Sequence, residues 1–569
     1  MKLEITSLYL KGFRNFSNAL INFNKSTLVL GSNDVGKSNM LHALRVMLDK
    51  SLSEVDIEPS ELDFHIGNEG IAEQAEIMIT LSQITEDAVL SILKGNVSDE
   101  GTTILKYVAQ RADLSYKIFV GHSLEELQEV SSRFYLKYVN LKYIQSQRDL
   151  ERFISKEKKQ LLRIAQQLLN ENDAKNDEAL LANISNDLSA LNTKISQLKY
   201  VKSATNDVNK ELKKLAHHHS NYEVQLDTGA IEVNDFIDKL QLGAITNGSS
   251  VMLGGDGRNN QILLALWKAK SIIEHDTDHE VVFYVIEEPE AHLHPHQQRK
   301  LASYLMDELP GQTIISSHSP QIAVNFKPDS IIRLFSKNGA TVAASNGCSN
   351  CIAEGWEDMS YRMSILPAEA FFSNGVFLVE GPSEILFYNE LAEQLNIELD
   401  YENLSILSVD GISFKVYVSI LNALEIPWVI RTDNDISKVP RKNEWQYAGI
   451  NRCLELAGSL KYANSYISLS PQDSVDYGYW HLVSSHTADQ GIFLSKVDLE
   501  TDLINELSQK VLAALELTEK SKAIEYLQKK KALRMRELLR NLKTSLSLLN
   551  SGDLAKPLHK LLAISKAVS

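Results

Sequence analysis

Residues 31–38, GSNDVGKS, decide the fold of the first half of the chain, because they fit the pattern G-x-x-x-x-G-K-[ST]. An apolar run, STLVL, precedes them at 26–30, and a helix is predicted over 38–49. Glycines let backbone N–H groups approach phosphate oxygens, and the helix N-terminus adds partial positive charge. Lys37 is placed to reach the β- and γ-phosphates of ATP, and Ser38 can offer its hydroxyl to Mg²⁺. We therefore expect an ATP site formed by Gly31, Asn33, Gly36, Lys37, Ser38 and Asn39.

A second acidic stretch belongs to the sequence VVFYVIEEPE at 281–290, in which the first six residues are apolar. Such continuous apolar runs, here and at 312–316 (QTIIS), are typical of parallel strands buried on both faces. Glu287 stands at the carboxyl tip of its strand, where it can hold Mg²⁺ beside the glycine-rich loop, and Glu288 can polarise the attacking water. His318 follows the second strand and can contact the γ-phosphate. A solvated acidic turn and a histidine satisfied in the core are the alternatives.

Together these stretches resemble the ABC-type ATPases of the SMC, Rad50, RecF and OLD group. The resemblance implies that Glu287 is the Walker B acid, Glu288 the catalytic glutamate and His318 the switch histidine, with a D-loop at 290–295. The family signature is degenerate, since its nearest match, LGGDG at 253–257, lacks the usual serine. This departure affects the expected rate of ATP turnover more than nucleotide binding. A second head completes each site in such ATPases, so a homodimer or larger homo-oligomer is implied.

The sequence changes character between about 149 and 219, where neither Gly nor Pro occurs. Leucines and isoleucines recur there at three- and four-residue steps, which is typical of an antiparallel helical pair or a short coiled coil. We expect a dimerisation arm, because the apolar stripe needs a partner to cover it. A helical insertion with solvated outer faces is the alternative. A glycine-rich loop at 243–258 and a helix at 260–273 follow.

Carboxylates end two further apolar strands in the second half of the chain. Glu380 ends GVFLVE, and Glu384 follows it by four residues at the start of a predicted helix. Asp433 and Asp435 end PWVIRTDND about fifty residues later. The carboxyl tips of neighbouring parallel strands converge at one edge of a sheet. Hard oxygen donors at that edge suit Mg²⁺ or Mn²⁺, so a metal site is expected there.

This order of motifs is that of a Toprim domain, and after an ABC-type ATPase it resembles the OLD-family nucleases over nearly the whole chain. In length and layout it is most similar to the GajA-like class of the Gabija anti-phage system. The resemblance implies a DNA endonuclease that cuts phosphodiesters with two metal ions, under control of the ATPase domain. It also implies double-stranded DNA as substrate and a UvrD-like helicase as a partner.

The family also uses a later acidic cluster and a C-terminal lysine. Asp498 and Glu500 match the acidic part, and they would share a face on a strand or extended turn, with Asp502 as a rival. The resemblance thus makes metal ligands of Glu380, Glu384, Asp433, Asp435, Asp498 and Glu500, besides Ser38 and Glu287 at the ATP site. The lysine falls in the run Lys529, Lys530, Lys531, of which Lys530 is chosen without a deciding reason. The basic segment 529–543 is a candidate contact to the DNA backbone, or else a solvated helix face.

The bulk composition bounds the compartment and the number of domains. The chain of 569 residues carries a formal net charge of −16, so DNA must be met by local basic residues rather than by the whole protein. Three cysteines cannot form a disulfide framework, and no secretory signal or membrane-spanning run is found, so the protein is expected to be cytoplasmic and away from membranes. The expected α/β organisation is an ABC-type ATPase domain over 1–148 and 226–345, a helical insertion over 149–225, a linker over 346–372 and a Toprim domain with C-terminal helices over 373–569.

Two other functions are weighed against the endonuclease. A DNA-repair or chromosome-maintenance ATPase of the SMC or RecF type could use its Toprim part only to bind DNA, but the carboxylate set argues against it. A topoisomerase- or primase-like Toprim enzyme is the other candidate. A topoisomerase needs a nucleophilic tyrosine in a separate domain, and none stands out among the twenty tyrosines.

Overall fold

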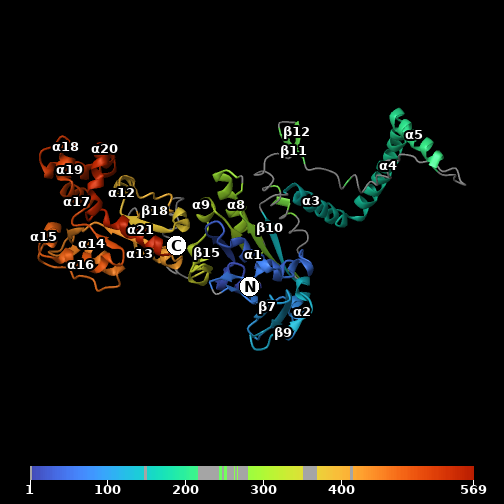
Figure 1. The fold of residues 1–569 in the computed structure, drawn as a ribbon, viewed down its shortest axis with the longest axis horizontal. Coiled ribbons are helices and arrows are strands. Elements are labelled where there is room, and N and C mark those ends of the chain that lie inside the picture. The colour runs from blue at the N-terminus through green and yellow to red at the C-terminus, as the bar shows by residue number, and fades with distance from the viewer. Residues whose placement is uncertain are drawn as a thin grey trace. The chain divides into compact units, whose positions relative to one another are not determined.

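The computed structural model describes residues 3–145 except 69, 150–215, 280–349 except 292 and 310, and 368–568 except 410–413, with short pieces between 237 and 269 (Figure 1). The chain divides into two compact units. The first comprises Met1–Gln145, Thr277–Glu290 and His294–Ser569, and the second comprises Ser146–Asp276 and Ala291–Leu293. Within the described ranges, no helix combines the length and the apolar character that a bilayer span requires.

An antiparallel sheet of six strands opens the chain, in the order β2-β1-β6-β7-β8-β9. In β6 buried and partly exposed residues alternate, as expected for a sheet with one face in the core. The six-residue helix α2, Asp87–Ile92, follows β6. The strands are β1 Glu4–Phe13, β2 Phe16–Asn22, β6 Gln74–Ser82, β7 Thr103–Gln110, β8 Ser115–Gly121 and β9 Gln128–Val130.

A second sheet of six strands carries the glycine-rich loop, in the order β10-β13-β14-β3-β15-β16. All of its neighbours pair in parallel except β15 and β16. Every residue of β13 is buried, which confirms the expectation drawn from its continuous apolar run. Helices α8 Pro295–Asp307 and α9 Pro320–Ala323 follow β13 and β14. The strands are β3 Ser26–Leu30, β10 Val139–Gln145, β13 Val281–Glu287, β14 Thr313–Ser316, β15 Ile331–Lys337 and β16 Ala340–Ala343.

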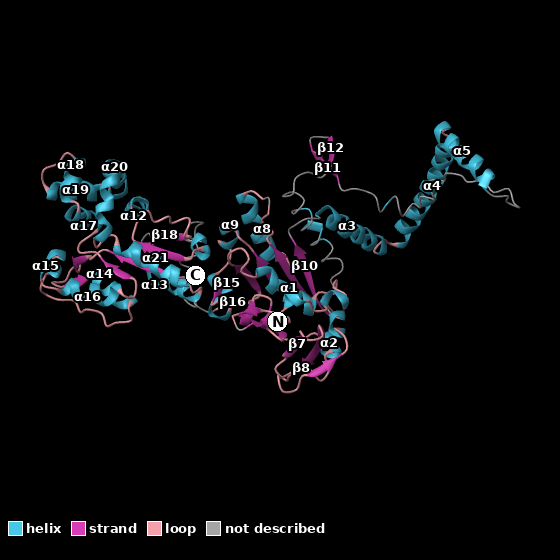
Figure 2. Ribbon diagram, in the orientation of Figure 1, coloured by secondary structure: helices cyan, strands magenta, loops and turns pink. Residues whose placement is uncertain are grey.

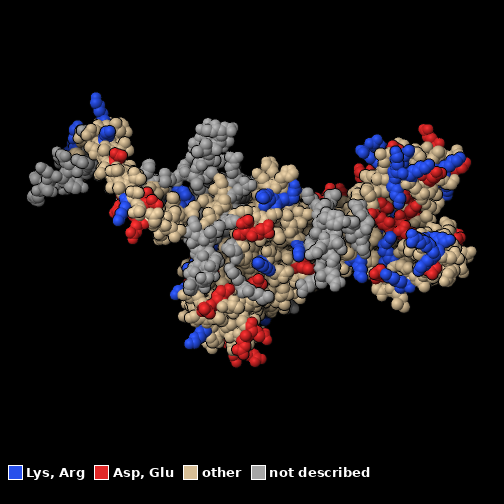
Figure 3. Space-filling model, turned by 180° about the vertical axis from the view of Figure 1, so that it is seen from behind, with Lys and Arg blue, Asp and Glu red and all other residues tan. Residues whose placement is uncertain are grey.

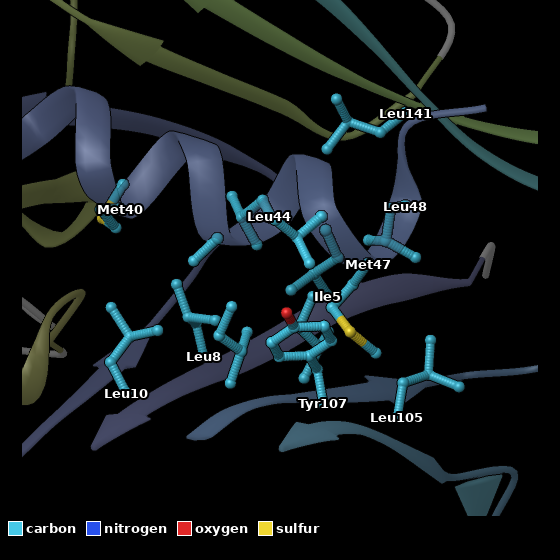
Figure 4. Packing of buried hydrophobic residues seen from close by; sticks show 14 of the residues in the cluster. Ile5, Leu8, Leu10, Met40, Leu44, Met47, Leu48, Leu105, Tyr107 and Leu141 are labelled. Atoms are coloured by element: carbon cyan, nitrogen blue, oxygen red, sulfur yellow. The ribbon is translucent and has the colours of Figure 1, made fainter. Parts of the chain in front are cut away.

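Helix α1, Lys37–Leu48, packs into one core with strands of both sheets (Figure 4). Met40, Leu44 and Met47 of this helix are fully or almost fully buried. They share the core with Ile5 of β1 and Leu105 of β7. Burying a side chain of this size contributes roughly 1.5–3 kcal/mol, so the core fixes the helix that starts at the glycine-rich loop.

The C-terminal part contains a parallel sheet, whose strands are magenta in Figure 2. Its strand order is β18-β17-β19-β22. Helices α12 Pro382–Gln394 and α13 Phe414–Ala423 connect its first three strands, and the last helix, α21 Lys556–Val568, packs on β17 and β19. The strands are β17 Gly375–Val379, β18 Leu404–Ser408, β19 Trp428–Thr432 and β22 Ile492–Leu494.

Two groups of smaller elements complete this part. The first lies between β19 and β22, and the second follows β22, where a mainly helical region was expected. The first group is β20 Ile436–Lys438, β21 Trp445–Tyr447, α14 Ala448–Leu456, α15 Pro471–Asp476 and α16 Tyr479–Ala488. The second is α17 Leu499–Glu506, α18 Ser508–Ala514, α19 Lys520–Lys529 and α20 Lys531–Leu542.

Residues 150–215, the longest described stretch of the second unit, form three helices where an antiparallel pair or short coiled coil was expected: α3 Leu150–Gln167, α4 Glu171–Ser196 and α5 Lys199–Leu215. The prediction of two was wrong because the chain turns twice, at 168–170 and at 197–198. The leucine stripe of α4 is open to solvent, with Leu180 and Leu191 more than half exposed. Among the residues that the structure describes, nothing covers these two leucines.

β16 extends the second sheet to Ala343, shortly before the linker expected over 346–372. Nearby, Arg333 of β15 is buried and donates to the carbonyls of Leu424 and Glu425 at the end of α13, and to that of Ser373 just before β17. This guanidinium joins the second sheet to the sheet of the C-terminal part.

Candidate functional sites

The glycine-rich loop has the geometry that its sequence requires. Gly36 lies in the left-handed region with φ of 102°, and a Cβ atom there would stand 2.0 Å from the Asn15 amide. A Cβ at Gly31 would stand 2.7 Å from the carbonyl oxygen of Leu334. Both positions therefore need glycine, and the loop passes directly from β3 into α1 as predicted.

Lys37 is held over the loop, since its Nζ donates to the carbonyls of Gly31 and Ser32 at 2.9 Å each. Burial lowers the pKa of Lys37, and the nearby carboxylates of Glu288 and Glu287 act in the opposite direction. Asn33 is exposed at the loop, but the Asn39 side chain is engaged by Arg14 and Asn15.

Glu287 meets the loop at the end of β13. Its buried carboxylate accepts hydrogen bonds from the hydroxyls of Ser38 and Tyr143. Ser38 and Glu287 are the pair expected to flank Mg²⁺, and the structure brings them into direct contact. Tyr143 lies in β10, next to β13, and nothing in its local sequence distinguished it from other strand residues.

Glu288 and His318 face one another, with 3.2 Å between Oε1 and Nε2. Glu288 has a positive φ of 44°, which turns its side chain away from the strand direction. Burial lowers the pKa of His318, and Lys37 lowers it further, while Glu288 raises it. Glu290 accepts from Ser317 Oγ and the His318 backbone N–H, so it fixes the turn that presents the histidine.

Several expected features fall outside the described residues. They are the signature stretch 253–257 and most of the helix 260–273. After the segment expected to be the D-loop, His294 stands as the N-cap of α8.

The two strand-tip carboxylates of the C-terminal part come together as predicted. Glu380 ends β17 and Asp433 ends β19, and these strands are parallel neighbours. The carboxylate of Glu380 accepts from the backbone N–H of Asp433 at 2.9 Å and from the Thr432 hydroxyl at 2.5 Å. Burial raises the pKa of Asp433 well above its usual value, and the charge of Glu380 raises it further.

Two more carboxylates are buried beside Asp433. Burial raises the pKa of Glu384, in the first turn of α12, to about 6, and Glu500 adds to the shift. Glu500 is 0% exposed and accepts from Ser383 Oγ at 3.0 Å through one oxygen. Its other oxygen, Oε2, is buried without a hydrogen-bond partner. An orphaned carboxylate oxygen among other acids is costly unless a cation completes it.

The expectation that Asp498 and Glu500 share a face of a strand is wrong. Asp498 is the N-cap of α17, where it accepts from the Thr501 N–H, and its other oxygen accepts from Gln528. Glu500 lies inside the first turn of the helix. Aspartate is a preferred N-cap residue, and at Asp498 this helix-start signal prevails over the strand pattern.

Asp502, the rival to these two residues, is committed elsewhere. Its carboxylate lies 2.8 Å from the Arg431 guanidinium, and both side chains are less than a tenth exposed. It also accepts from the backbone N–H groups of Lys496 and Val497. Asp502 therefore fixes the start of α17 and the interior of β19.

Of the three lysines, the structure places Lys531 beside the acidic cluster. Lys531 Nζ lies 3.8 Å from the Asp433 carboxylate, whereas Lys529 pairs with Glu525 and Lys530 is an exposed residue between α19 and α20. Burial lowers the pKa of Lys531, but Glu500, Asp433 and Glu384 outweigh it and leave the pKa raised. Lys531 is the first residue of α20, and its side chain is 49% exposed.

Arg452 of α14 is the functional candidate that sequence reasoning missed. It donates to Glu380 and to the Thr432 hydroxyl, and at 3.0 Å to Asp435. It lines a cleft of about 530 Å³ with Glu380, Lys415 and other side chains. No motif marks an arginine that follows Asp435 by seventeen residues.

The donor set suits a hard divalent cation, although it is not a finished cage. Across the described ranges, no three His, Cys, Asp or Glu side chains lie close enough to hold one ion as they stand. Arg452 accounts for part of this, because it spans Glu380 and Asp435. The unsatisfied oxygen of Glu500 and the raised pKa values of Asp433 and Glu384 indicate an acidic cluster whose charge is incompletely balanced.

Comparison with protein-family models supports both halves of this description. Residues 371–435 match the family "Overcoming lysogenization defect protein-like, TOPRIM domain". Residues 7–216 and 115–323 match an AAA domain and an AAA ATPase domain. The chain therefore has an ATPase domain, which contains the site around Lys37, and a Toprim domain, which contains the site around Glu380.

Similar proteins share this arrangement. Endonuclease GajA of Bacillus cereus (strain VD045) is 26% identical over 578 aligned positions, which cover 95% of this chain and 96% of GajA. The OLD nuclease of Thermus scotoductus is 28% identical over 27% of this chain and 30% of its own length. The Smc head domain of Pyrococcus furiosus aligns with 60% of the chain at 17% identity, with a TM-score of 0.37, too low to carry an argument. The chain is an OLD-family protein that joins an ATPase domain to a Toprim domain.

Proposed function

We propose that the chain is a divalent-metal-dependent DNA endonuclease whose Toprim domain cuts phosphodiesters and whose ABC-type ATPase domain controls the cut. The observation that carries the proposal is the meeting of Glu380 and Asp433 at adjacent strand tips, with buried Glu384 and Glu500 and the ammonium of Lys531 around them. The full-length similarity to an endonuclease supports the same activity.

Four carboxylates would hold the metal: Glu380, Asp433, Glu384 and Glu500. Asp435 and Asp498 lie at the edge of this group. One or two Mg²⁺ or Mn²⁺ ions bound there supply the Lewis acid chemistry that generates a hydroxide and stabilises the leaving oxygen. Lys531 is placed to neutralise charge that develops on the phosphate, and Arg452 is placed to bind phosphate once it leaves Glu380 and Asp435.

The ATPase domain would bind ATP through Lys37 and the backbone of residues 31–38, with Mg²⁺ between Ser38 and Glu287. Glu288 would orient the attacking water. His318 follows β14, and its Nε2 lies 3.2 Å from Oε1 of Glu288. The exposed leucines of α4 support a second copy of the chain as partner. A UvrD-like helicase and a role in anti-phage defence stay predictions, which co-purification and phage plating would check.

A plasmid-nicking assay in Mg²⁺ and in Mn²⁺, with and without ATP, tests the proposal. We expect Glu380→Ala and Asp433→Ala to abolish cleavage while nucleotide binding is retained. Asp489→Ala removes an exposed carboxylate at the end of α16 and should cleave like the wild type. Cleavage that persists in both active-site variants would show that these carboxylates do not form the nuclease site.

A further inference from the structure

The segment between β19 and β22 of the Toprim domain, residues 436–488, is built onto the metal-site loop. β20 starts directly after Asp435, and the Ala448 N–H donates to the carbonyl of Asp435. The side-chain amide of Asn434 is buried and donates to Ser474 Oγ of α15 at 2.9 Å. A Cβ atom at Gly449 would lie 2.0 Å from the Asp433 carbonyl oxygen. The segment is therefore fixed to the residues that flank the predicted cut.

The surface of this segment is rich in exposed aromatic and apolar side chains. Tyr466 is 73% exposed and Tyr477 70% exposed. The rings of Tyr462 and Tyr479, in the same segment, contact one another edge to face, with centroids 6.0 Å apart. Single exposed hydrophobic residues are ordinary, but a concentration of them marks a binding surface. The large hydrophobic side chains exposed between 460 and 482 are Leu460, Tyr462, Tyr466, Ile467, Tyr477, Tyr479 and Leu482.

Positive charge lies on the hairpin that leads away from the metal site. Lys438, Arg441 and Lys442 are exposed in or near the turn between β20 and β21. No ion pair joins them to an acid in the ranges that the structure describes. Figure 3 shows Lys and Arg on both sides of the acidic side chains in the C-terminal part. In a chain with a net charge of −16, such a local basic surface is a specific feature.

Cations and exposed tyrosines together select one class of ligand. Lysine and arginine neutralise phosphates, while aromatic rings stack on bases that are not stacked on other bases. In an intact duplex the bases are stacked on each other and closed to a tyrosine ring. A peptide partner would not call for unpaired cations beside a phosphodiester site.

Ser465 pairs with Trp445 of the hairpin, so Tyr466 lies beside it. We infer that five exposed side chains of this segment, Lys438, Arg441, Lys442, Tyr466 and Tyr477, named here the tyrosine–hairpin face, bind DNA with unpaired bases next to the Toprim metal site. The face holds the backbone through the hairpin and the open bases through the tyrosines. Substrates with a gap or a single-stranded flank are bound more tightly than uninterrupted duplex. This inference rests on the proposed endonuclease function for its substrate, but not for its binding surface.

The test is fluorescence anisotropy of the full-length chain, in EDTA so that nothing is cut, with a gapped duplex and a matching intact duplex as probes. We expect Tyr466→Ala with Tyr477→Ala to weaken binding of the gapped probe at least tenfold and of the intact duplex less than twofold. The triple variant Lys438→Ser/Arg441→Ser/Lys442→Ser should bind both probes more weakly. The dependence of log affinity on log salt concentration should fall by about 0.7–0.9 per lost phosphate contact.

Matched controls come from the opposite edge of the same sheet. Tyr401 is 82% exposed just before β18, and Lys566 is exposed in α21. Tyr401→Ala and Lys566→Ser should bind both probes like the wild type. Thermal melting checks that each variant is folded.

Two outcomes would overturn the inference. If the affinity of the double variant Tyr466→Ala/Tyr477→Ala for the gapped probe is within twofold of that of the wild type, unpaired bases are not the ligand. If the basic triple variant binds both probes unchanged, the face does not bind DNA at all. Either result leaves the nuclease proposal standing when the wild type still nicks plasmid in a Glu380-dependent way. Conversely, if the variants lose DNA binding but the wild type never cuts DNA, the tyrosine–hairpin face is supported and the nuclease proposal is rejected.

Discussion

The ammonium group of Lys531 lies 3.8 Å from the carboxylate of Asp433, at the junction of α20 and the tip of β19. Asp433 is buried, so this cation offsets negative charge that water cannot reach. The contact distinguishes Lys531 from two neighbours with the same side chain.

Lys531→Ala should therefore reduce cleavage at least a hundredfold, because the charge that develops on the phosphate loses its nearest ammonium group. Lys530→Ala should stay within about threefold of the wild type, since that side chain is exposed. Plasmid nicking at saturating Mn²⁺ measures both rates. Equal losses in the two variants would contradict the assignment and point to a general effect of the basic run.

Arg452→Gln should strengthen Mn²⁺ binding about three- to tenfold, because a divalent cation no longer competes with a guanidinium for Glu380 and Asp435. Arg452→Lys keeps the charge and should fall between the two. Isothermal titration with Mn²⁺ alone gives the affinity without relying on cleavage. Unchanged affinity in Arg452→Gln would show that the arginine does not share the cation's ligands.

Glu384 should make the metal-free protein less stable as pH rises. Burial raises its pKa from about 4.5 to about 6, so the folded chain holds the proton more tightly than the unfolded chain. Stability from this group is complete below 4.5 and is lost as pH passes 6, by about 2 kcal/mol in all. Glu384→Gln should thus gain on the wild type between pH 4.5 and 7.5 in EDTA. Melting curves that run parallel over this range would contradict the shift.

Asp502→Ala should cost about 3–5 kcal/mol of unfolding free energy, because it leaves the buried Arg431 guanidinium without its partner. The same change at Asp489, which is exposed, should cost less than about 0.5 kcal/mol. Urea denaturation in EDTA compares them. A small loss for Asp502→Ala, combined with lost metal binding, would make Asp502 a ligand rather than a structural partner.

Glu288→Gln should bind ATP with normal affinity but hydrolyse it at least tenfold more slowly, because the amide cannot take up a proton from the attacking water. Lys37→Ala should bind ATP at least tenfold more weakly, since its ammonium is held over the loop by Gly31 and Ser32. A fluorescent ATP analogue and phosphate release measure the two properties. Normal hydrolysis by Glu288→Gln would exclude this carboxylate from the water's side.

The strands and their carboxyl tips were predictable because several local signals agreed. Continuous apolar runs, a glycine loop and a following helix specified β3, α1 and β13, and the spacing of Glu380 and Asp433 specified β17 and β19. Parallel pairing then brought the tips together without any information about side-chain contacts. The elements that position the two sites could therefore be read from residues 26–48, 281–287, 375–384 and 428–433.

What could not be predicted depends on contacts between distant residues. Arg452 enters the site only because α14 packs beside the Asp433 turn, and Tyr143 only because β10 pairs with β13. Lys531 reaches Asp433 only because the start of α20 lies near the end of β19. For Asp498, an N-cap signal competed with the strand pattern and prevailed.

Arg333 binds the chain near the amino ends of β17 and β19, not near their carboxyl ends. Its carbonyl partners stand just before β17 and shortly before β19, while the carboxylates stand five and more residues further on, at the opposite ends. A single side chain of the ATPase sheet thus contacts the chain just before both strands. A shift of β15 that moves Arg333 would therefore act on β17 and β19 together rather than on one of them.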